Sequence, residues 1–411
     1  MIKILSLSIL LLAIIFSTGF CAAGKIPTGI KFNRDTIFRT NGIGDNWCIT
    51  WAADNSQVTS MCDGNLLEVI QRKRTYHNHL YRFIGEADGF SREDIPNYPQ
   101  FSGKQASWFG YGIVSVDGIL YSVVSKTPGT SWSGPFRGIK LLKSPDNGET
   151  WYRVGRDGSE RKLLGPLDEA RKEVNDREMF FLEEYGLPHQ EQMAYPFSSL
   201  DFVQCGKDNS AAKDDYLYMY SPEGAHSHLL LLARVRKDRI GFRDEWEYFL
   251  KFDGGKPVWT SDIRQRGYVH EFSEKNPDGY YFSWYSWLPS VVWNEGLGLY
   301  IMVTGGTYAG KTMTSTDKDY YHRWMHTKTG SLGFWYSENP WGPWHNFYYT
   351  DYWIADDPRN LTYQPKLSPK WISDDGREMI FIWSDAQKNE RGQSHSVNYR
   401  WNHMKITIET E

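Results

Sequence analysis

The sequence has 411 residues, a formal net charge of −4 and only four cysteines. Its acidic and basic residues are interspersed, which excludes the basic footprint of a nucleic-acid-binding protein and a basic membrane-binding patch, and the few cysteines exclude a disulfide-built scaffold. Aromatic residues make up 16% of the chain beside 37 glycines. This composition favours short strands, tight turns and flat apolar surfaces on which sugar rings can stack.

The N-terminal segment is typical of a secretory signal peptide. Lys3 supplies a positive charge, residues 4–20 are mainly apolar, and Cys21-Ala22-Ala23 places small residues before Gly24. We therefore expect residues 1–23 to be removed and the mature chain, 24–411, to be secreted or periplasmic. A membrane anchor is one alternative, but the apolar run is short for a span of about 20 residues. Lipidation at Cys21 is the other, but Phe20 is bulky where a lipoprotein signal has a small residue.

The mature chain consists mainly of strand and turn signals, and helical periodicity is confined to residues 166–185 and 236–246. The predicted strands, in chain order, cover residues 47–51, 58–61, 112–116, 120–125, 138–143, 217–220, 229–234, 291–293, 300–304, 333–336, 347–349, 379–383 and 397–408. Many hairpins at short spacing, without parallel β-α-β units, indicate a sandwich, a barrel or a propeller.

Two segments favour the propeller. Residues 144–151 fit the pattern S-x-D-x-G-x-T-W, which resembles the Asp-box turn of sialidase-type propellers. In such a turn Ser144 and Asp146 accept hydrogen bonds from backbone amides, Gly148 takes a positive φ and Trp151 packs between blades, so its role is structural. Residues 333–344 resemble the outer hairpin of five-bladed glycosidase propellers.

The hairpins fall into five groups, and no linker rich in Pro, Gly or Ser separates them. The groups begin near Asp45, Trp108, Pro196, Phe282 and Gln364. The sequence therefore predicts an all-β fold, a five-bladed β-propeller formed by one domain over residues 24–411. We expect a short, partly helical insertion at about residues 156–190.

The first hairpin brings two carboxylates together. Strand 47–51 turns at Asp54-Asn55 and returns through residues 58–62, so residues whose numbers add to about 109 are neighbours. Asp45 and Asp63 should then lie at the same end of the hairpin. Two such carboxyl groups are the minimal apparatus of a glycoside hydrolase, one as acid and one as base or nucleophile. The alternative is that both are ordinary turn residues.

Histidines offer a rival apparatus. His77 and His79 share one strand face, and two polar clusters follow, one with His189, Gln190 and Glu191 and one with Glu223 and His226. His189 and Glu191 are further catalytic candidates. A polysaccharide lyase acting on uronic acids needs a base, an acid and a positive charge. A histidine and a tyrosine, with Arg137 or Lys366 to neutralise the substrate carboxylate, would suit that chemistry. A third hypothesis is a non-catalytic glycan-binding propeller.

Candidates for binding the sugar surround the predicted mouth, and packing between blades is the alternative role of each aromatic residue. They are Asn46, Trp108, Tyr111, Arg137, Gln190, Tyr195, Glu223, His226, Trp284, Trp287, Tyr363 and Gln364. We expect carbohydrate as the partner, no nucleic acid or membrane, and a monomer. No zinc motif is present and no cofactor is expected, although a structural calcium ion in the channel is left open. Cys48 and Cys62 could form a disulfide or remain two buried thiols.

Several motifs resemble one family of bacterial propellers, known as domain of unknown function 4185. They are GDNWCITWAAD at 44–54, CDG at 62–64, KDDYLYMYSP at 213–222, LLARV at 231–235, PVWT at 257–260 and PWGPW at 340–344. The resemblance runs from about Asp45 to the C-terminus. It implies a five-bladed propeller, in a family that includes endo-D-arabinanases, with hydrolysis by Asp45 and Asp63. This sequence departs from the family in two ways. Members often have an acidic pair where Ala53-Asp54 stands, and residues 163–185 look specific to a subgroup. The resemblance therefore does not indicate which substrate this protein takes.

Overall fold

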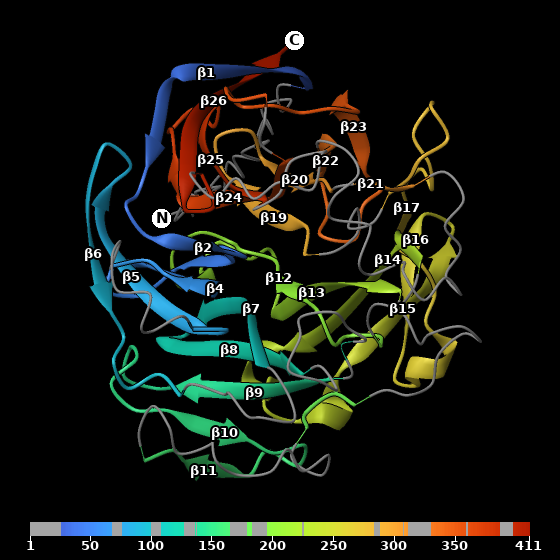
Figure 1. Ribbon diagram of the computed structural model, residues 1–411. Helices are drawn as coiled ribbons and strands as arrows, with labels where there is room; N and C mark the ends of the chain where they lie inside the picture. The colour runs from blue at the N-terminus through green and yellow to red at the C-terminus, as the bar shows by residue number, and fades with distance from the viewer. Residues whose placement is uncertain are drawn as a thin grey trace, which may run out of the picture.

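Five antiparallel sheets are arranged as the blades of a propeller (Figure 1). The computed structural model describes residues 26–67, 76–99, 108–126, 136, 138–164, 179–182, 195–223, 226–282, 288–306, 308–310, 330–358, 361–386 and 398–411. The protein is therefore an all-β, five-bladed β-propeller, as the hairpin spacing predicts.

The blades follow one another in chain order. The first contains β2 (Ile43–Asp45), β3 (Ile49–Trp51), β4 (Gln57–Asn65), β5 (His79–Glu86) and β6 (Gly89–Asp94). The second contains β7 (Trp108–Val116), β8 (Ile119–Lys126), β9 (Ile139–Ser144), β10 (Tyr152–Val154) and β11 (Glu160–Lys162). The third contains β12 (Asp201–Phe202), β13 (Tyr216–Glu223), β14 (His226–Arg236), β15 (Glu247–Asp253), β16 (Lys256–Thr260) and β17 (His270–Glu271).

The last two blades complete the ring. The fourth contains β19 (Ser290–Asn294), β20 (Leu299–Thr304), β22 (Leu332–Ser337) and β23 (His345–Thr350). The fifth contains β24 (Leu361–Ile372), β25 (Glu378–Ala386), β26 (Asn402–Thr410) and β1 (Pro27–Arg39). A separate two-stranded sheet pairs β18 (Tyr281–Phe282) with β21 (Tyr308–Gly310).

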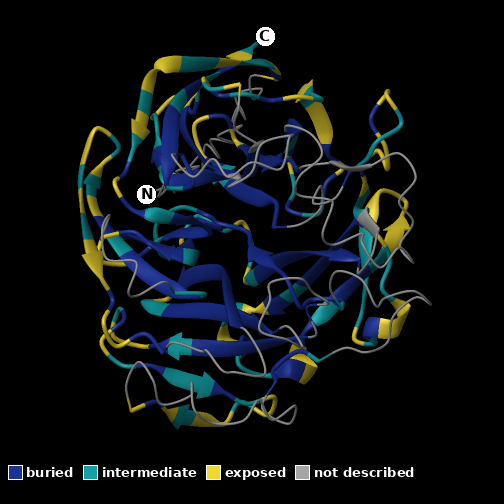
Figure 2. Ribbon diagram, in the orientation of Figure 1, coloured by how far each residue is buried: buried dark blue, intermediate teal, exposed yellow. Residues whose placement is uncertain are grey.

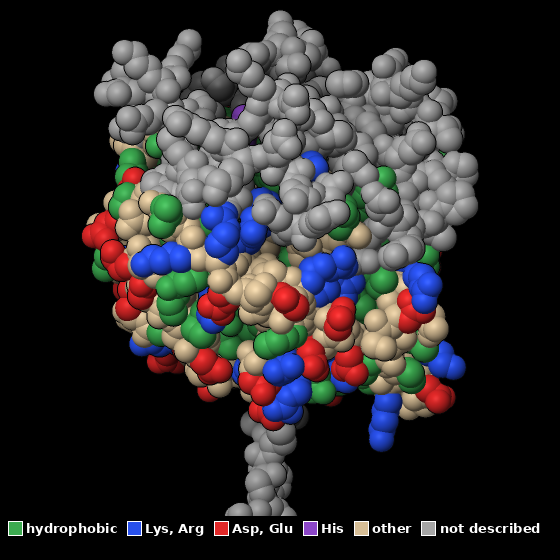
Figure 3. Space-filling view, turned by 90° about the horizontal axis from the view of Figure 1, so that it is seen from below, with side chains coloured by type: hydrophobic (Ala, Val, Ile, Leu, Met, Phe, Trp, Pro, Cys, Tyr) green, Lys and Arg blue, Asp and Glu red, His purple; other side chains and the backbone are tan. Residues whose placement is uncertain are grey.

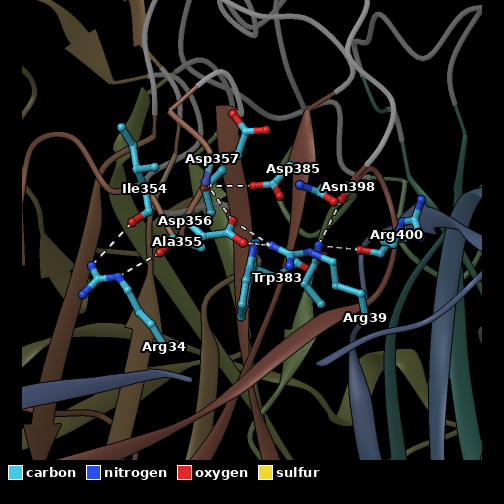
Figure 4. A network of polar contacts seen from close by, with 12 residues as sticks. Arg34, Arg39, Ile354, Ala355, Asp356, Asp357, Trp383, Asp385, Asn398 and Arg400 are labelled. Carbon is cyan, nitrogen blue, oxygen red and sulfur yellow. Dashed lines mark hydrogen bonds and ion pairs between the residues drawn. The ribbon is translucent and has the colours of Figure 1, made fainter. Parts of the chain in front are cut away.

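The N-terminal strand β1 is the outermost strand of the fifth blade, and it was not among the predicted strands. It pairs with β26 near the C-terminus, with Ile30 opposite Ile408 and Phe32 opposite Ile406. Figure 4 shows how β1 also reaches the segment before β24: Arg34 Nε donates to the Ala355 carbonyl at 2.8 Å, and Arg39 forms an ion pair of 2.7 Å with Asp356. The first and last described strands thus close the ring together.

The inner strands are buried on both faces because neighbouring blades cover them, and Figure 2 shows this as dark blue strands around the centre. The turn at residues 144–151 has the local contacts expected of it. Ser144 Oγ and Asp146 Oδ1 each accept a backbone N–H at 2.8 Å, and Trp151 is 1% exposed. Gly148 has a φ of 98° and a Cβ there would lie 2.9 Å from Ile95, so glycine suits the position.

Helices are almost absent from the described residues. The stretch predicted at 236–246 forms two single 3₁₀ turns, η3 (Lys237–Arg239) and η4 (Arg243–Glu245), in the short connection between β14 and β15 of the third blade. Two more 3₁₀ turns are η2 (Lys207–Asn209) and η5 (Ile263–Gln265). Most of the predicted helix at 166–185 lies outside the described residues. Among the described residues, no helix has the length and apolar character needed to cross a membrane.

The surface charges are interspersed (Figure 3), and the described cysteines are unpaired. On the described surface seen in Figure 3, basic and acidic side chains alternate. Cys48, Cys62 and Cys205 are all free and buried, so the thiol alternative applies to Cys48 and Cys62. The Cys62 thiol donates to the Gly110 carbonyl at 2.9 Å, which links the first blade to the second. Within the described ranges, no group of three His, Cys, Asp or Glu side chains could hold a metal ion.

Candidate active site in the first blade

The two predicted carboxylates lie on neighbouring strands. Asp45 ends β2 and pairs with Cys62 of β4, and Asp63 follows directly. Farther along the hairpin, Ile49 pairs with Thr59, so the register agrees with the predicted one to within two residues. Asp54 stands in the turn at the other end, where its Oδ1 accepts the Ser56 amide at 2.9 Å. The hairpin therefore separates Asp45 and Asp63 from Asp54, as predicted.

A close approach of the backbone fixes this end of the hairpin. Gly64 exchanges two backbone hydrogen bonds with Tyr76, at 3.0 and 2.9 Å. A Cβ at Gly64 would lie 1.9 Å from the Ile43 carbonyl oxygen, so only glycine lets β2 and β4 approach here. This pairing brings His77, the next residue after Tyr76, alongside Asp63.

Asp45 is a buried acid. Its carboxyl is 6% exposed, and the Tyr363 hydroxyl donates to its Oδ2. Burial, followed by the negative charge of Asp63, raises the pKa of Asp45 to about 8, although hydrogen bonds from Tyr363 and Tyr399 act in the opposite direction. At neutral pH this carboxyl group therefore holds its proton and can donate it.

Asp63 has a different environment. Its side chain is 27% exposed, and its Oδ1 lies 2.6 Å from Nδ1 of His77. The hydrogen bond to Asp63 raises the pKa of His77, with burial opposing the shift. The contact orients the Asp63 carboxyl group, and protonation of His77 places a positive charge beside it. The site thus contains two carboxyl groups in contrasting environments, one buried with a raised pKa and one partly exposed beside an imidazole, and acid–base catalysis uses such a contrast.

The comparisons with known proteins concern the fold. No protein-family model matches the sequence, and no curated protein does either. The chain is similar to a putative hydrolase from Bacteroides ovatus, with a TM-score of 0.47, 12% identity and coverage of 89% of this chain and 85% of that one. It is also similar to an α-L-arabinofuranosidase from Podospora anserina, solved with cellotriose, with a TM-score of 0.42, 9% identity and coverage of 94% and 96%.

A third similar structure is a GH43 enzyme from Xanthomonas citri, with a TM-score of 0.42, 12% identity and coverage of 89% and 87%. Glycoside hydrolases are thus among the solved structures that this chain resembles. Likenesses of this size assign neither residues nor a substrate. The resemblance to the bacterial propeller family likewise stays a prediction.

Three predicted binding residues join the first blade to the fifth. Gln364 Oε1 accepts the backbone amide of Asn46 at 2.8 Å, and Tyr363 contacts Asp45 as described. Asn46 and Gln364 have left-handed φ values of 57° and 53°, a conformation that Asn adopts more readily than most residues. All three side chains are buried, so their structural role is to hold the acid, and direct contact with a sugar stays a prediction.

The aromatic candidates in the second blade pack in the interior. Trp108 is 3% and Tyr111 is 1% exposed, and the Lys140 ammonium lies 4.9 Å from the centre of the Trp108 ring. Packing between blades, the alternative given above, describes both residues. Tyr195 is partly exposed, and its amide donates to the Phe136 carbonyl at 2.6 Å. Stacking of a sugar on any of the three stays a prediction.

Two charged residues have partners that the sequence does not reveal. Glu223 is buried and forms a bidentate pair with Arg266, at 2.8 Å from Nε and 2.5 Å from Nη2. Lys366 is fully buried, lies 3.2 Å from Asp201 and donates to the Leu288 carbonyl. Lys366 is therefore not available to neutralise a substrate carboxylate, because it is buried and Asp201 already pairs with its charge.

Some of the predicted residues lie in segments that the structure does not describe. Arg137, His189, Gln190, Glu191, Trp284 and Trp287 lie outside the described residues, as does the side chain of His226. The signal peptide at residues 1–23 lies outside them too. The two contributions that sequence reasoning missed are Tyr399, beside Asp45, and the contact of His77 with Asp63. His77 was recognised as a polar candidate, but only the pairing of Gly64 with Tyr76 reveals its partner.

Proposed function

We propose that the protein is an exported glycoside hydrolase that cleaves a polysaccharide or oligosaccharide with Asp45 and Asp63. The observation that carries the proposal is the contrast between the two neighbouring carboxyl groups. Asp45 is buried with a raised pKa, whereas Asp63 is partly exposed and held by His77. Glycoside hydrolysis uses such a pair, and the motif resemblance to a propeller family with endo-D-arabinanases supports the same assignment.

In this mechanism Asp45 donates its proton to the glycosidic oxygen as the bond to the leaving sugar breaks. Asp63, as carboxylate, either attacks the anomeric carbon or takes a proton from the attacking water. Tyr363 and Tyr399 orient the Asp45 carboxyl through their hydroxyl groups, and they also stabilise its anion after the proton has left. His77 holds Asp63 in place through the contact of its Nδ1 with Oδ1 of the carboxyl group.

The test is digestion of a glycan panel that includes D-arabinan, with the purified mature chain and three variants. Asp45→Asn and Asp63→Asn should each lower turnover by about 10²–10⁴-fold, the range typical of a lost acid or base. Asp54→Asn is the matched control, because Asp54 lies at the opposite end of the same hairpin. It should leave turnover unchanged, and the melting curves of all four proteins should confirm that they are folded.

The other hypotheses are outcomes of the same experiment. Full activity in both Asp45→Asn and Asp63→Asn would disprove the assignment. Binding without product release would identify a non-catalytic propeller. Products from uronic-acid polymers that absorb in the ultraviolet would identify a lyase. If hydrolysis is found, NMR of the first product formed will show whether the anomeric configuration is retained or inverted.

A further inference from the structure

A pocket of about 400 Å³ lies on the side of the propeller, between the third and fourth blades. It is lined by residues of β17 and the two positions after it, and by β22, β23 and Trp344 just before β23; Figure 1 shows these strands on the right of the ring. The lining residues are His270, Glu271, Phe272, Ser273, Trp335, Trp344, Asn346 and Tyr349. Asp45 and Asp63 belong to the first blade and have no part in it.

The pocket has an aromatic floor and a polar rim. Phe272, Trp335 and Trp344 are buried, and the rings of Phe272 and Trp335 meet at 5.1 Å in an edge-to-face contact. The exposed residues around them are Glu271, Ser273, Asn346 and Tyr349. A volume of about 300–1,000 Å³ with apolar walls and a few polar groups is typical of sites for small ligands.

Two polar side chains in this pocket have free hydrogen-bonding capacity. Among the described residues, neither the His270 imidazole nor the Glu271 carboxylate takes part in a hydrogen bond or ion pair. Burial lowers the pKa of His270 to about 4, so its ring is neutral and offers one donor and one acceptor. The ring nitrogens of His270 are not fully enclosed, so water can bind them until a ligand takes its place.

We propose that this pocket is a second carbohydrate-binding site, which takes one or two neutral sugar units. A sugar ring presents an apolar C–H face that suits the aromatic floor, and hydroxyl groups that both donate and accept hydrogen bonds. Those hydroxyl groups match the mixed donors and acceptors of His270, Glu271 and Ser273. An apolar peptide side chain would fill the floor but leave the imidazole and the carboxylate without partners. An organic cation would match Glu271, and it is the competing ligand in the test.

The test measures binding of four neutral trisaccharides, built from arabinose, xylose, glucose and mannose, by titration calorimetry and saturation-transfer NMR. The host is the Asp63→Asn protein, in which turnover should be suppressed. Tyr349→Ala should weaken binding of at least one trisaccharide roughly tenfold, as expected when a contacting aromatic ring is removed. Tyr352→Ala is the matched control, because both tyrosines are 39% exposed and each donates to a carboxylate, but only Tyr349 lines the pocket.

Glu271→Gln is the second variant, since it keeps the shape of an exposed side chain and leaves folding unaffected. It should also weaken binding, whereas binding at the mouth of the propeller should be unchanged. Binding that is equally strong in Tyr349→Ala and Tyr352→Ala, no binding of any of the four sugars at millimolar concentration, or saturation by choline in their place would overturn the proposal. Failure of the proposed hydrolysis would not overturn it, because the glycan panel tests the site in the first blade, whereas this titration tests the side pocket.

Discussion

The raised pKa of Asp45 makes the stability of the protein depend on pH in an unusual direction. In the unfolded chain this carboxyl group ionises with its ordinary pKa of 3.8, whereas in the folded protein the pKa is about 8. Between these values the folded protein keeps a proton that the unfolded chain has released. The contribution of Asp45 to stability is therefore fully present below pH 4 and decreases as the pH rises to 8.

Asp45→Asn removes this dependence, because the amide does not titrate and its oxygen can still accept the hydrogen bond from Tyr363. The free energy of unfolding of the variant, minus that of the wild type, should increase by about 1.4 kcal/mol per pH unit. Over the roughly four units that separate the two pKa values, the difference should change by on the order of 5 kcal/mol. The relative gain of the variant is thus largest at pH 8.

The assay is urea denaturation of the wild-type chain 24–411 and of its Asp45→Asn variant at pH 5, 6, 7 and 8. Asp54→Asn serves as control. Burial raises the pKa of Asp54, but hydrogen bonds from Ser56 and Asn147 outweigh it and lower the pKa overall. The contribution of Asp54 to stability is lost only in acid. The difference in free energy of unfolding between Asp54→Asn and the wild type should therefore stay constant from pH 5 to 8. Parallel curves for the wild type and Asp45→Asn would show that the Asp45 carboxyl is ionised in the folded protein, and would refute its role as the acid.

Three further predictions concern the contacts around this site and the closure of the ring. Tyr363→Phe removes a hydrogen bond that lowers the pKa of Asp45, so the same pH series should show a higher pKa and a loss of about 1 kcal/mol in stability. Arg266→Met removes the bidentate ion pair of the buried Glu223 and should cost about 3–5 kcal/mol in urea denaturation, most of which a second change, Glu223→Gln, should restore. Deletion of residues 26–39 exposes the edge of β26, so size-exclusion chromatography should show aggregates, and a soluble monomer with an unchanged melting temperature would contradict this.

The parts of the fold that could be predicted depend on local signals. Hairpins with turn residues between apolar runs fix the blades one at a time, and counting across one hairpin places Asp45 beside Asp63. The outer strand β1 could not be paired in this way, because its partner β26 lies more than 360 residues away in the sequence. The ion pair of Glu223 with Arg266 joins residues 43 positions apart, with β14, β15 and β16 between them, so no single hairpin offers a register to count along.

The aromatic candidates for sugar binding show a second limit of prediction from the sequence. In β7 every residue from Trp108 to Val116 is buried, because neighbouring blades cover both faces of the strand. The alternation of buried and exposed residues that normally shows which way a strand faces is therefore missing. Sequence alone could not decide whether Trp108 and Tyr111 pack between blades or face a ligand. The side pocket was not predicted for a related reason, since it lies between two blades and needs residues from both.

The clasp formed by β1 and β26 places the two ends of the described chain side by side. Pro27 is opposite Thr410, and the Glu411 amide donates to the Ile26 carbonyl at 3.1 Å. A short linker could therefore join them, and new ends could be opened at the exposed Gly254-Gly255 turn between β15 and β16. In such a circular permutant β1 would follow β26 directly. The fifth blade would then be built from contiguous sequence, and the seam of the ring would move to a different blade.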